Sequence, residues 1–326
     1  MINHTNERAM FYGKKDVFAY RTYLKPLSGI RKIPESDFAG RNNIIFGINV
    51  SVSVGGEELL PSFAEGDNSK VVATDSMKNF IQRHLGSYDG STIEGFVSYV
   101  SKSFLERYPH FESIQMTGKE VPFKSVKAIT EQGLKESPLV FDHSRNECAE
   151  ASVAMKRYGE TIEMRDQKSG ITGLQLIKVK GNSFVGFVRD EYTTLPEDGN
   201  RPLFIYLNIY WRYADAEQAY GEDPNLYAAA EQIKDIAASV FHELETASIQ
   251  HLIYKIGCRI LHRFPQLKDI TFESQNRTWE TVVEDIEGSE GKVYTEPRPP
   301  YGFQIFTVTQ EDALQDIDSL EEQISK

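Results

Sequence analysis

The chain has 326 residues, of which 40% are hydrophobic and 26% are charged, which suits a globular protein with two ordinary domains rather than a disordered one. Its formal net charge of −12 at pH 7 argues against nucleic-acid binding, because such proteins usually carry a basic surface. No apolar run approaches the roughly 18 residues of a membrane span. The first residues lack the apolar core of a secretory signal, and the final Ile-Ser-Lys is not the Ser-Lys-Leu peroxisomal address. We therefore expect a cytoplasmic protein with no membrane or nucleic-acid partner.

Two cysteines, Cys148 and Cys258, are too few for a disulfide framework. Cys148 lies in an alternating pattern typical of a strand and Cys258 in a helical pattern, so we expect both to be small buried hydrophobes. They also fall short of a zinc site, which needs three or four ligands at fixed spacings. The sequence therefore predicts no metal site.

In the first half of the chain, alternating apolar residues predict strands and a 3.6-residue period predicts helices. The expected order is two strands, two helices and then returning strands. The ranges are 16–24 and 43–54 for the first strands, about 77–85 and 92–108 for the helices, and 113–117, 123–129 and 147–157 for the returning strands.

The second half repeats this order without a residue-by-residue repeat, so the duplication is one of architecture. Strands are expected at 173–180, 182–189 and 203–213, helices at 225–243 and 248–263, and closing strands at 267–273 and 303–309. We assign residues 10–158 and 159–309 to two units and expect the acidic segment 310–326 to be a frayed tail.

Antiparallel strands with helices inserted between them predict an α+β fold, in which the helices pack on one face of each sheet. The other face of the sheet also alternates apolar and polar residues, so something must cover it as well.

The stretch VVATDSMKNFIQRHL, which starts at Val71, predicts a strand that passes directly into a helix. Thr74, Asp75 and Ser76 lie at the junction, and all three residue types favour a helix N-cap. Free backbone N–H groups and the helix dipole would suit an anion or a polar ring edge at this point. The alternative is that Asp75 or Ser76 merely caps the helix.

Five stretches together carry a resemblance to a known family. They are YGKKDVF at 12–18, VVATDS at 71–76, NSFVGFVRDEYTTL at 182–195, SIQ at 248–250 and QN at 275–276. In this order they closely resemble the cofactor-independent urate oxidases (uricases), particularly those of bacilli, from about residue 12 to 309. The resemblance implies the tunnelling fold (T-fold), with two such units in each chain. It also implies a homotetramer whose sheets close into a barrel around a tunnel, with active sites at the subunit interfaces.

The resemblance places the family's catalytic lysine at Lys14, which would otherwise read as a solvated charge at a strand end. A lysine amine held against an apolar ring can accept a proton, because burial disfavours its charged form. Thr74 matches the threonine whose hydroxyl relays that proton. Asp75 is expected to contact the substrate through its backbone N–H.

Substrate-binding positions also follow from the resemblance. Arg201, by default a surface arginine, matches a two-pronged contact with urate, and Gln250 matches the amide at the opposite edge. Phe184, by default a core aromatic, matches the ring that stacks on the purine. Leu195 and Ile249 would add apolar wall or backbone contacts.

Asn276 matches the residue above the purine plane where dioxygen and later water bind, although a turn would explain it equally well. The wider family has a histidine two residues later, whereas this chain has Thr278. A threonine hydroxyl can pass a proton but cannot ionise near neutrality as histidine does. How the proton relay closes is therefore an open question.

The implied activity is oxidation of urate by dioxygen and water to 5-hydroxyisourate and hydrogen peroxide without a cofactor, in purine degradation toward allantoin. Two alternatives stay open. One is a related pterin or purine cyclohydrolase of the same fold, although the zinc-dependent ones need Cys and His ligands that this chain does not cluster. The other is a non-catalytic purine-binding protein, which the missing histidine would suit.

Overall fold

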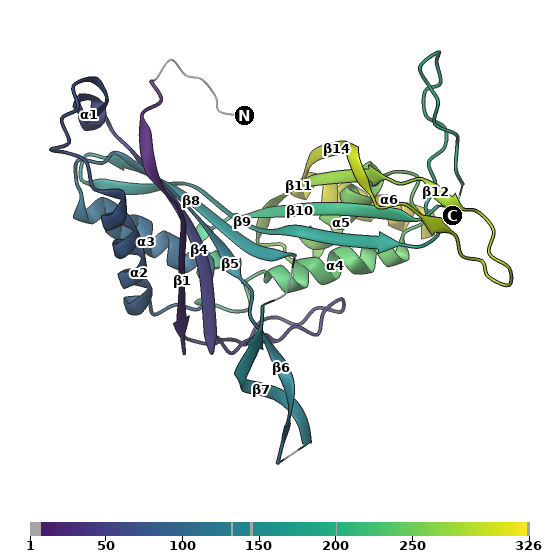
Figure 1. Ribbon diagram of the computed structural model, residues 1–326, viewed down its shortest axis with the longest axis horizontal. Coiled ribbons are helices and arrows are strands. Elements are labelled where there is room, and N and C mark those ends of the chain that lie inside the picture. The colour runs from purple at the N-terminus through teal and green to yellow at the C-terminus, as the bar shows by residue number, and fades with distance from the viewer. Residues whose placement is uncertain (1–7, 132, 144–145, 200, 325–326) are drawn as a thin grey trace. The chain divides into compact units, whose positions relative to one another are not determined.

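The computed structural model describes residues 8–131, 133–143, 146–199 and 201–324. The chain divides into two compact units. Unit 1 consists of the chain up to Arg31, Ala39–Ser169 and Asp215–Tyr227; unit 2 consists of Lys32–Phe38, Gly170–Ala214 and the chain from Ala228 onward. Each unit contains sheet strands with helices packed on them, so the predicted α+β class is confirmed (Figure 1). The predicted boundaries 10–158 and 159–309 stay a prediction.

The main sheet of unit 1 contains β1 (Phe11–Thr22), β4 (Ile45–Gly55), β5 (Ser113–Val121) and β8 (Cys148–Tyr158), in that order and antiparallel. Two helices, α2 (Thr74–Ser87) and α3 (Ile93–Arg107), pack against it (Figure 1). The apolar residues at helical spacing in α2, Met77, Ile81 and Leu85, are buried as the pattern predicts.

Unit 1 also contains several smaller elements. They are β2 (Leu27–Ser28), β3 (Gly40–Arg41), the 3-10 helices η1 (Glu57–Leu59) and η2 (Ala216–Tyr220), α1 (Leu60–Ala64), and the hairpin of β6 (Lys124–Thr130) and β7 (Gly133–Asp142). The hairpin projects from the sheet of its unit (Figure 1).

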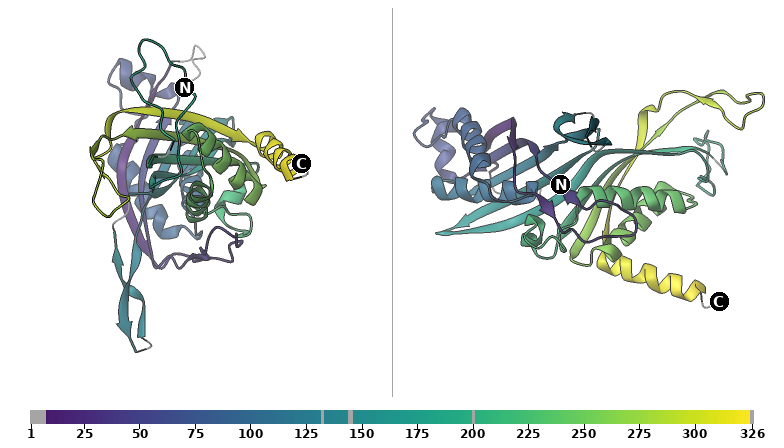
Figure 2. Two further views of the ribbon diagram at one scale, coloured as in Figure 1. Left: turned by 90° about the vertical axis from the view of Figure 1, so that its right-hand side faces the viewer. Right: turned by 90° about the horizontal axis from the view of Figure 1, so that it is seen from below.

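Unit 2 repeats the order of strands and helices. Its sheet contains the end of β9 (Thr161–Lys178), then β10 (Leu203–Tyr213), β11 (Leu267–Thr278) and β14 (Arg298–Thr309), with a separate pair of β12 (Thr281–Val283) and β13 (Val293–Tyr294). The helices are α4 (Ala230–Glu243), α5 (Ile249–Arg263) and α6 (Gln310–Ile324), of which α5 packs against β11 and β14 (Figure 2). Trp211, Ile256 and Phe272 lie in the resulting core.

The predicted strand before α2 is wrong. Val72 has no strand partner, because its backbone N–H donates to the Tyr12 hydroxyl at 2.8 Å and its carbonyl accepts from the same hydroxyl at 3.1 Å. The capping alternative is also wrong, since Ala73 is the N-cap and makes no side-chain bond. The Asp75 carboxylate instead accepts from Lys78 Nζ at 2.5 Å and from Asn79 Nδ2 at 3.2 Å.

The predicted strand at 182–189 is a loop. Asn182 and Phe184 each form one isolated bridge, with Thr246 and Asp198 respectively, and no ladder follows. The helix expected from residue 225 begins only at Ala230, because residues 223–227 form turns.

The frayed-tail interpretation of the C-terminal segment is wrong for its first residues, which begin α6. The carboxylate of Asp316 accepts from Lys255 Nζ at 2.5 Å, and Ala313 is 1% exposed. The imidazole of His262 lies 2.8 Å from the Ala313 carbonyl oxygen. The segment is therefore anchored to α5.

Neither Cys148 nor Cys258 forms a disulfide in the described part of the chain; Cys258 is buried as predicted, whereas Cys148 is half-buried. Within the ranges that the structure describes, no helix is long and apolar enough to cross a membrane.

Glu94, in the first turn of α3, is a carboxyl with only 2% of its surface exposed. Burial raises its pKa to about 7, against the opposing effect of hydrogen bonds from its own backbone N–H and Ser169 and of the Arg41 charge. This folded-state pKa lies above the ordinary value of 4.5. The unfolded chain therefore releases the proton first, and the free energy of unfolding falls as pH rises between those two values.

We expect Glu94→Gln to remove this loss of stability, because the amide stays neutral at every pH. Thermal unfolding of the variant and the parent should agree near pH 4 and differ at pH 8, where the variant is more stable by on the order of 1–3 kcal/mol. Glu106→Gln, an exposed change on the same helix, is the control and should follow the parent. Parallel pH curves for Glu94→Gln and the parent would contradict the assignment.

Candidate active site

In unit 1 the predicted lysine lies beside a β-bulge in β1. Lys14 is opposite Val52 and Val17 is opposite Val50, so β1 has one extra residue between these pairs. Asp16, in the bulge, has a φ of 56°, in the left-handed region. Residues directly opposite each other in a sheet point to the same face. Because Val50 and Val52 are buried in the core, Lys14 lies on the face that also packs against α2.

The start of α2 lies within electrostatic reach of Lys14. The pKa of Asp75 is lowered first by the hydrogen bond from Lys78 and also by the charge of Lys14. Thr74 is the first residue of α2, whose first-turn N–H groups have no side-chain cap. The structure thus brings Lys14, Thr74 and Asp75 into one region of unit 1, with backbone donors available to a ligand.

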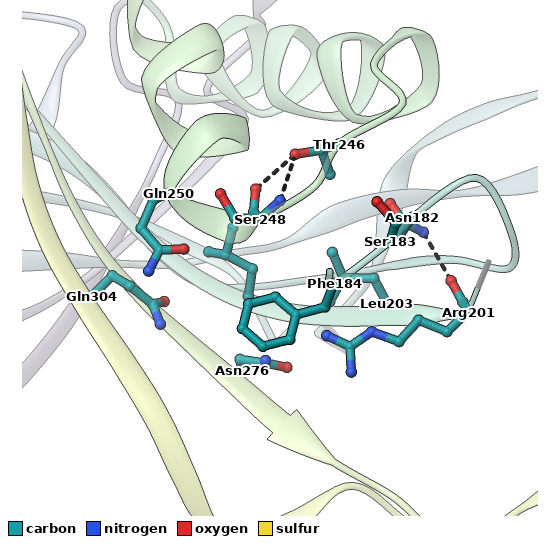
Figure 3. Close-up of a pocket in the computed structure, with 11 residues that line it drawn as sticks. Asn182, Ser183, Phe184, Arg201, Leu203, Thr246, Ser248, Gln250, Asn276 and Gln304 are labelled. Carbon is teal, nitrogen blue, oxygen red and sulfur yellow. Dashed lines mark hydrogen bonds between the residues drawn. The ribbon is translucent and has the colours of Figure 1, made fainter. Parts of the chain in front are cut away.

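In unit 2 five predicted residues meet at a cavity of about 110 Å³ (Figure 3). They are Phe184, Arg201, Ile249, Gln250 and Asn276. The remaining lining residues are Asn182, Ser183, Leu203, Thr246, Ser248 and Gln304. None of these six was predicted to bind the substrate, although three of them lie within the longer stretches that carry the family resemblance.

The loop from Asn182 to Arg201 is closed by its two ends. Arg201 N–H donates to the Asn182 carbonyl at 2.8 Å, and Asn182 Nδ2 donates to the Arg201 carbonyl at 3.2 Å. Ser183 N–H donates to the Thr246 carbonyl at 3.0 Å, which attaches the loop to the segment before α5. These bonds place the Arg201 side chain at the cavity.

Arg201 extends over the ring of Phe184, with its Cζ atom 5.5 Å from the ring centroid (Figure 3). Phe184 in turn stacks with Phe187 at 4.7 Å and 13°. Burial lowers the pKa of Arg201, whereas the charge of Asp198 raises it. Among the described residues Arg201 Nε is buried without a hydrogen-bond partner, so a planar cationic fork is available to a ligand with two acceptors.

The N-terminus of α5 forms another wall of the cavity. Ser248 is the N-cap, and its hydroxyl accepts from His251 N–H at 3.2 Å. Thr246 Oγ1 donates to the Ser248 carbonyl at 2.7 Å. This start of the helix buries Ile249 and leaves the amide of Gln250 exposed at the cavity.

Asn276 comes from β11, opposite Ile205 of β10 and Gly302 of β14. It shares a sheet face with the buried Ile205, which is the face on which α5 packs. In the described part of the chain, neither Asn276 nor Gln250 makes a side-chain hydrogen bond to another residue. Their amides, like the Arg201 fork, are therefore available to a ligand.

One predicted site residue of unit 2, Leu195, is 43% exposed and does not line this cavity. Thr278 ends β11, and its side chain lies outside the described part of the structure. Across the described ranges, no group of three or more His, Cys, Asp or Glu side chains is placed to hold a metal ion.

Known proteins resemble this chain over almost its whole length. The sequence profile of the family described as Uricase matches residues 167–305. A uric acid degradation bifunctional protein of Bacillus sp. strain TB-90 is 65% identical over 96% of this chain, which spans 62% of that relative. A uricase of the archaeon Halalkalicoccus jeotgali is 50% identical over 93% of this chain and 99% of its own length.

A solved structure resembles the fold as well. The crystal structure of Bacillus sp. TB-90 urate oxidase has a TM-score of 0.91 and 65% sequence identity, covering 93% of this chain and all of that one. The chain therefore belongs to the uricase family.

Proposed function

We propose that the chain oxidises urate with dioxygen and water to 5-hydroxyisourate and hydrogen peroxide. The observation that carries the proposal is the cavity where the Arg201 fork, the Gln250 amide and the Phe184 ring meet. Family membership over nearly the whole chain supports it, and no matched relative described above is named a cyclohydrolase.

The chemistry of urate fits these groups. Urate is a flat anion with amide edges, so an aromatic ring can stack on its face and a guanidinium can bind two of its acceptors. The Gln250 amide can donate and accept at the opposite edge. Ile249 supplies an apolar wall. The exposed loop segment that carries Leu195 would have to close over the ligand for Leu195 to contact it.

Lys14 and Thr74 act as the base in this proposal. The amine takes a proton from bound urate through the threonine hydroxyl, while the Asp75 N–H holds the ring edge. The electron-rich dianion then passes an electron to dioxygen near Asn276, and a peroxide adduct forms on the purine. Loss of hydrogen peroxide and addition of water give the product, so the substrate is its own reductant and no cofactor is needed. Thr278 passes a proton through its hydroxyl.

The two groups of site residues belong to different units of the chain, and we assign them to different subunits in the complete site. Each unit is a T-fold unit, and four chains associate so that their sheets close into a barrel. Edge strands support this assembly, because unpaired edges favour association. In unit 1 the edge strand β1 exposes Phe18 and Tyr20, and in unit 2 β14 exposes Phe303 and Ile305. We also propose that the chain is cytoplasmic, where thiols such as those of Cys148 and Cys258 stay reduced.

Urate turnover should persist in metal-free buffer, because no step uses a metal or flavin. The measurement is the fading of urate's ultraviolet absorbance after dialysis against a chelator, with hydrogen peroxide assayed in parallel. If turnover is lost after dialysis and is restored by added copper or zinc, the cofactor-free mechanism is wrong.

Arg201→Ala should raise the KM for urate by roughly 30- to 150-fold, since losing a charged two-pronged contact costs about 2–3 kcal/mol. Arg201→Lys keeps the charge without the fork and should recover only part of the affinity. Arg189→Ala, an exposed change in the same loop, is the matched control. A wild-type KM for Arg201→Ala would remove this residue from the site.

At a urate concentration far below the KM of Arg201→Ala, mixing two impaired variants should restore activity if each complete site uses two chains. Lys14→Met lacks the base and Arg201→Ala lacks the fork, so a mixed tetramer would contain some sites with both groups intact. The experiment refolds the two variants together and measures urate turnover of isolated mixed oligomers. Turnover no higher than that of the separately refolded variants would place both groups in one chain.

A further inference from the structure

Gln304 lines the cavity beside Asn276 but has no counterpart in the motifs that identified the site. It lies in β14, directly opposite Ser274 of β11, and Asn276 is opposite Gly302 of the same strand. Gln304 and Asn276 therefore project from the same face of two paired strands as diagonal neighbours. Figure 3 shows Gln304 to the left of the Phe184 ring and Asn276 below the ring, between Gln304 and the Arg201 guanidinium.

The orientation of the Gln304 amide is fixed by a buried serine. Ser274 is 1% exposed, and its hydroxyl donates to Gln304 Oε1 at 2.6 Å. This bond occupies the carbonyl oxygen of the amide, so its NH₂ group is the part left for the cavity. Among the described residues none accepts a hydrogen bond from Gln304 Nε2.

The NH₂ group of Gln304 lies beside Gly302. A Cβ atom built on Gly302 would lie 3.8 Å from Gln304 Nε2, so the NH₂ group is next to the strand position opposite Asn276. The two amides thus form one polar wall built on β11 and β14. Gln250, by contrast, projects from the start of α5.

We propose that Gln304 is a further catalytic residue, whose NH₂ group donates a hydrogen bond to the oxygen molecule as it gains charge beside Asn276. The proposal rests on the proposed oxidation of urate. When the urate dianion gives up one electron, dioxygen becomes superoxide, and combination of the two radicals gives an anionic peroxide adduct on the purine. A donor fixed in advance stabilises negative charge that develops at that oxygen. Ser274 is its positioning residue.

The test separates oxygen chemistry from urate binding. Gln304→Leu should lower kcat/KM for dioxygen by at least about tenfold, because one donor to a developing oxyanion is lost. The dissociation constant for urate, measured without oxygen by fluorescence or calorimetry, should stay within about twofold of the parent. Ser274→Ala leaves the amide present but unfixed, and should cause a smaller loss in the same parameter.

Gln304→Glu is the second variant. Its side chain has nearly the same shape as glutamine but lacks the NH₂ donor, so it still tests the proposal if Gln304→Leu fails to fold. Thr307→Val is the control, because it removes a hydroxyl bonded to Thr271 on the opposite face of β14. Wild-type kcat/KM for dioxygen in both Gln304 variants would overturn the proposal, as would an equal weakening of anaerobic urate binding. A parent protein that binds urate without consuming it would instead overturn the proposed function.

Discussion

The candidate site of unit 2 depends on the closure of one loop onto itself. Arg201 N–H donates to the Asn182 carbonyl, the Asn182 side-chain amide donates to the Arg201 carbonyl, and Ser183 N–H donates to the carbonyl of Thr246, two residues before the α5 cap. This set of hydrogen bonds therefore holds both the backbone of Arg201 and the segment that leads into α5. Among the described residues, Arg201 Nε is buried and has no hydrogen-bond acceptor. The closed loop therefore holds a partly desolvated cation with an unpaired donor, which favours the binding of an anionic ligand.

Two of the polar groups at the cavity stand on paired strands next to the apolar strand β10. β10 alternates buried and half-buried residues along its whole length, and β11 is paired with strands on both sides. The Asn276 and Gln304 amides consequently start from a rigid sheet, whereas Arg201 starts from a loop. This division suits a site in which the oxygen-side groups must stay fixed while the substrate-binding side admits the ligand.

The parts of the fold with strong local patterns could be predicted from the sequence. The strand at 203–213 has the predicted bounds, because its alternation continues without a break, and α5 begins one residue after its Ser248 cap. The segment at Val72 could not be predicted, since a tyrosine 60 residues earlier binds its peptide groups. The site residues came from the family resemblance. Gln304 was missed because a glutamine at an inward strand position belongs to no motif, and its role follows only from its neighbours in the sheet.

The Tyr12 hydroxyl has a consequence for assembly. It binds both peptide groups of Val72, two residues before Thr74, while Lys14 lies two residues after Tyr12 on the same strand. The strand position of Lys14 and the segment that leads into α2 are therefore linked through the Tyr12 side chain. In the proposed tetramer, a neighbouring subunit would align with one linked group rather than with two independent segments, which would lower the conformational entropy lost when the complete site forms.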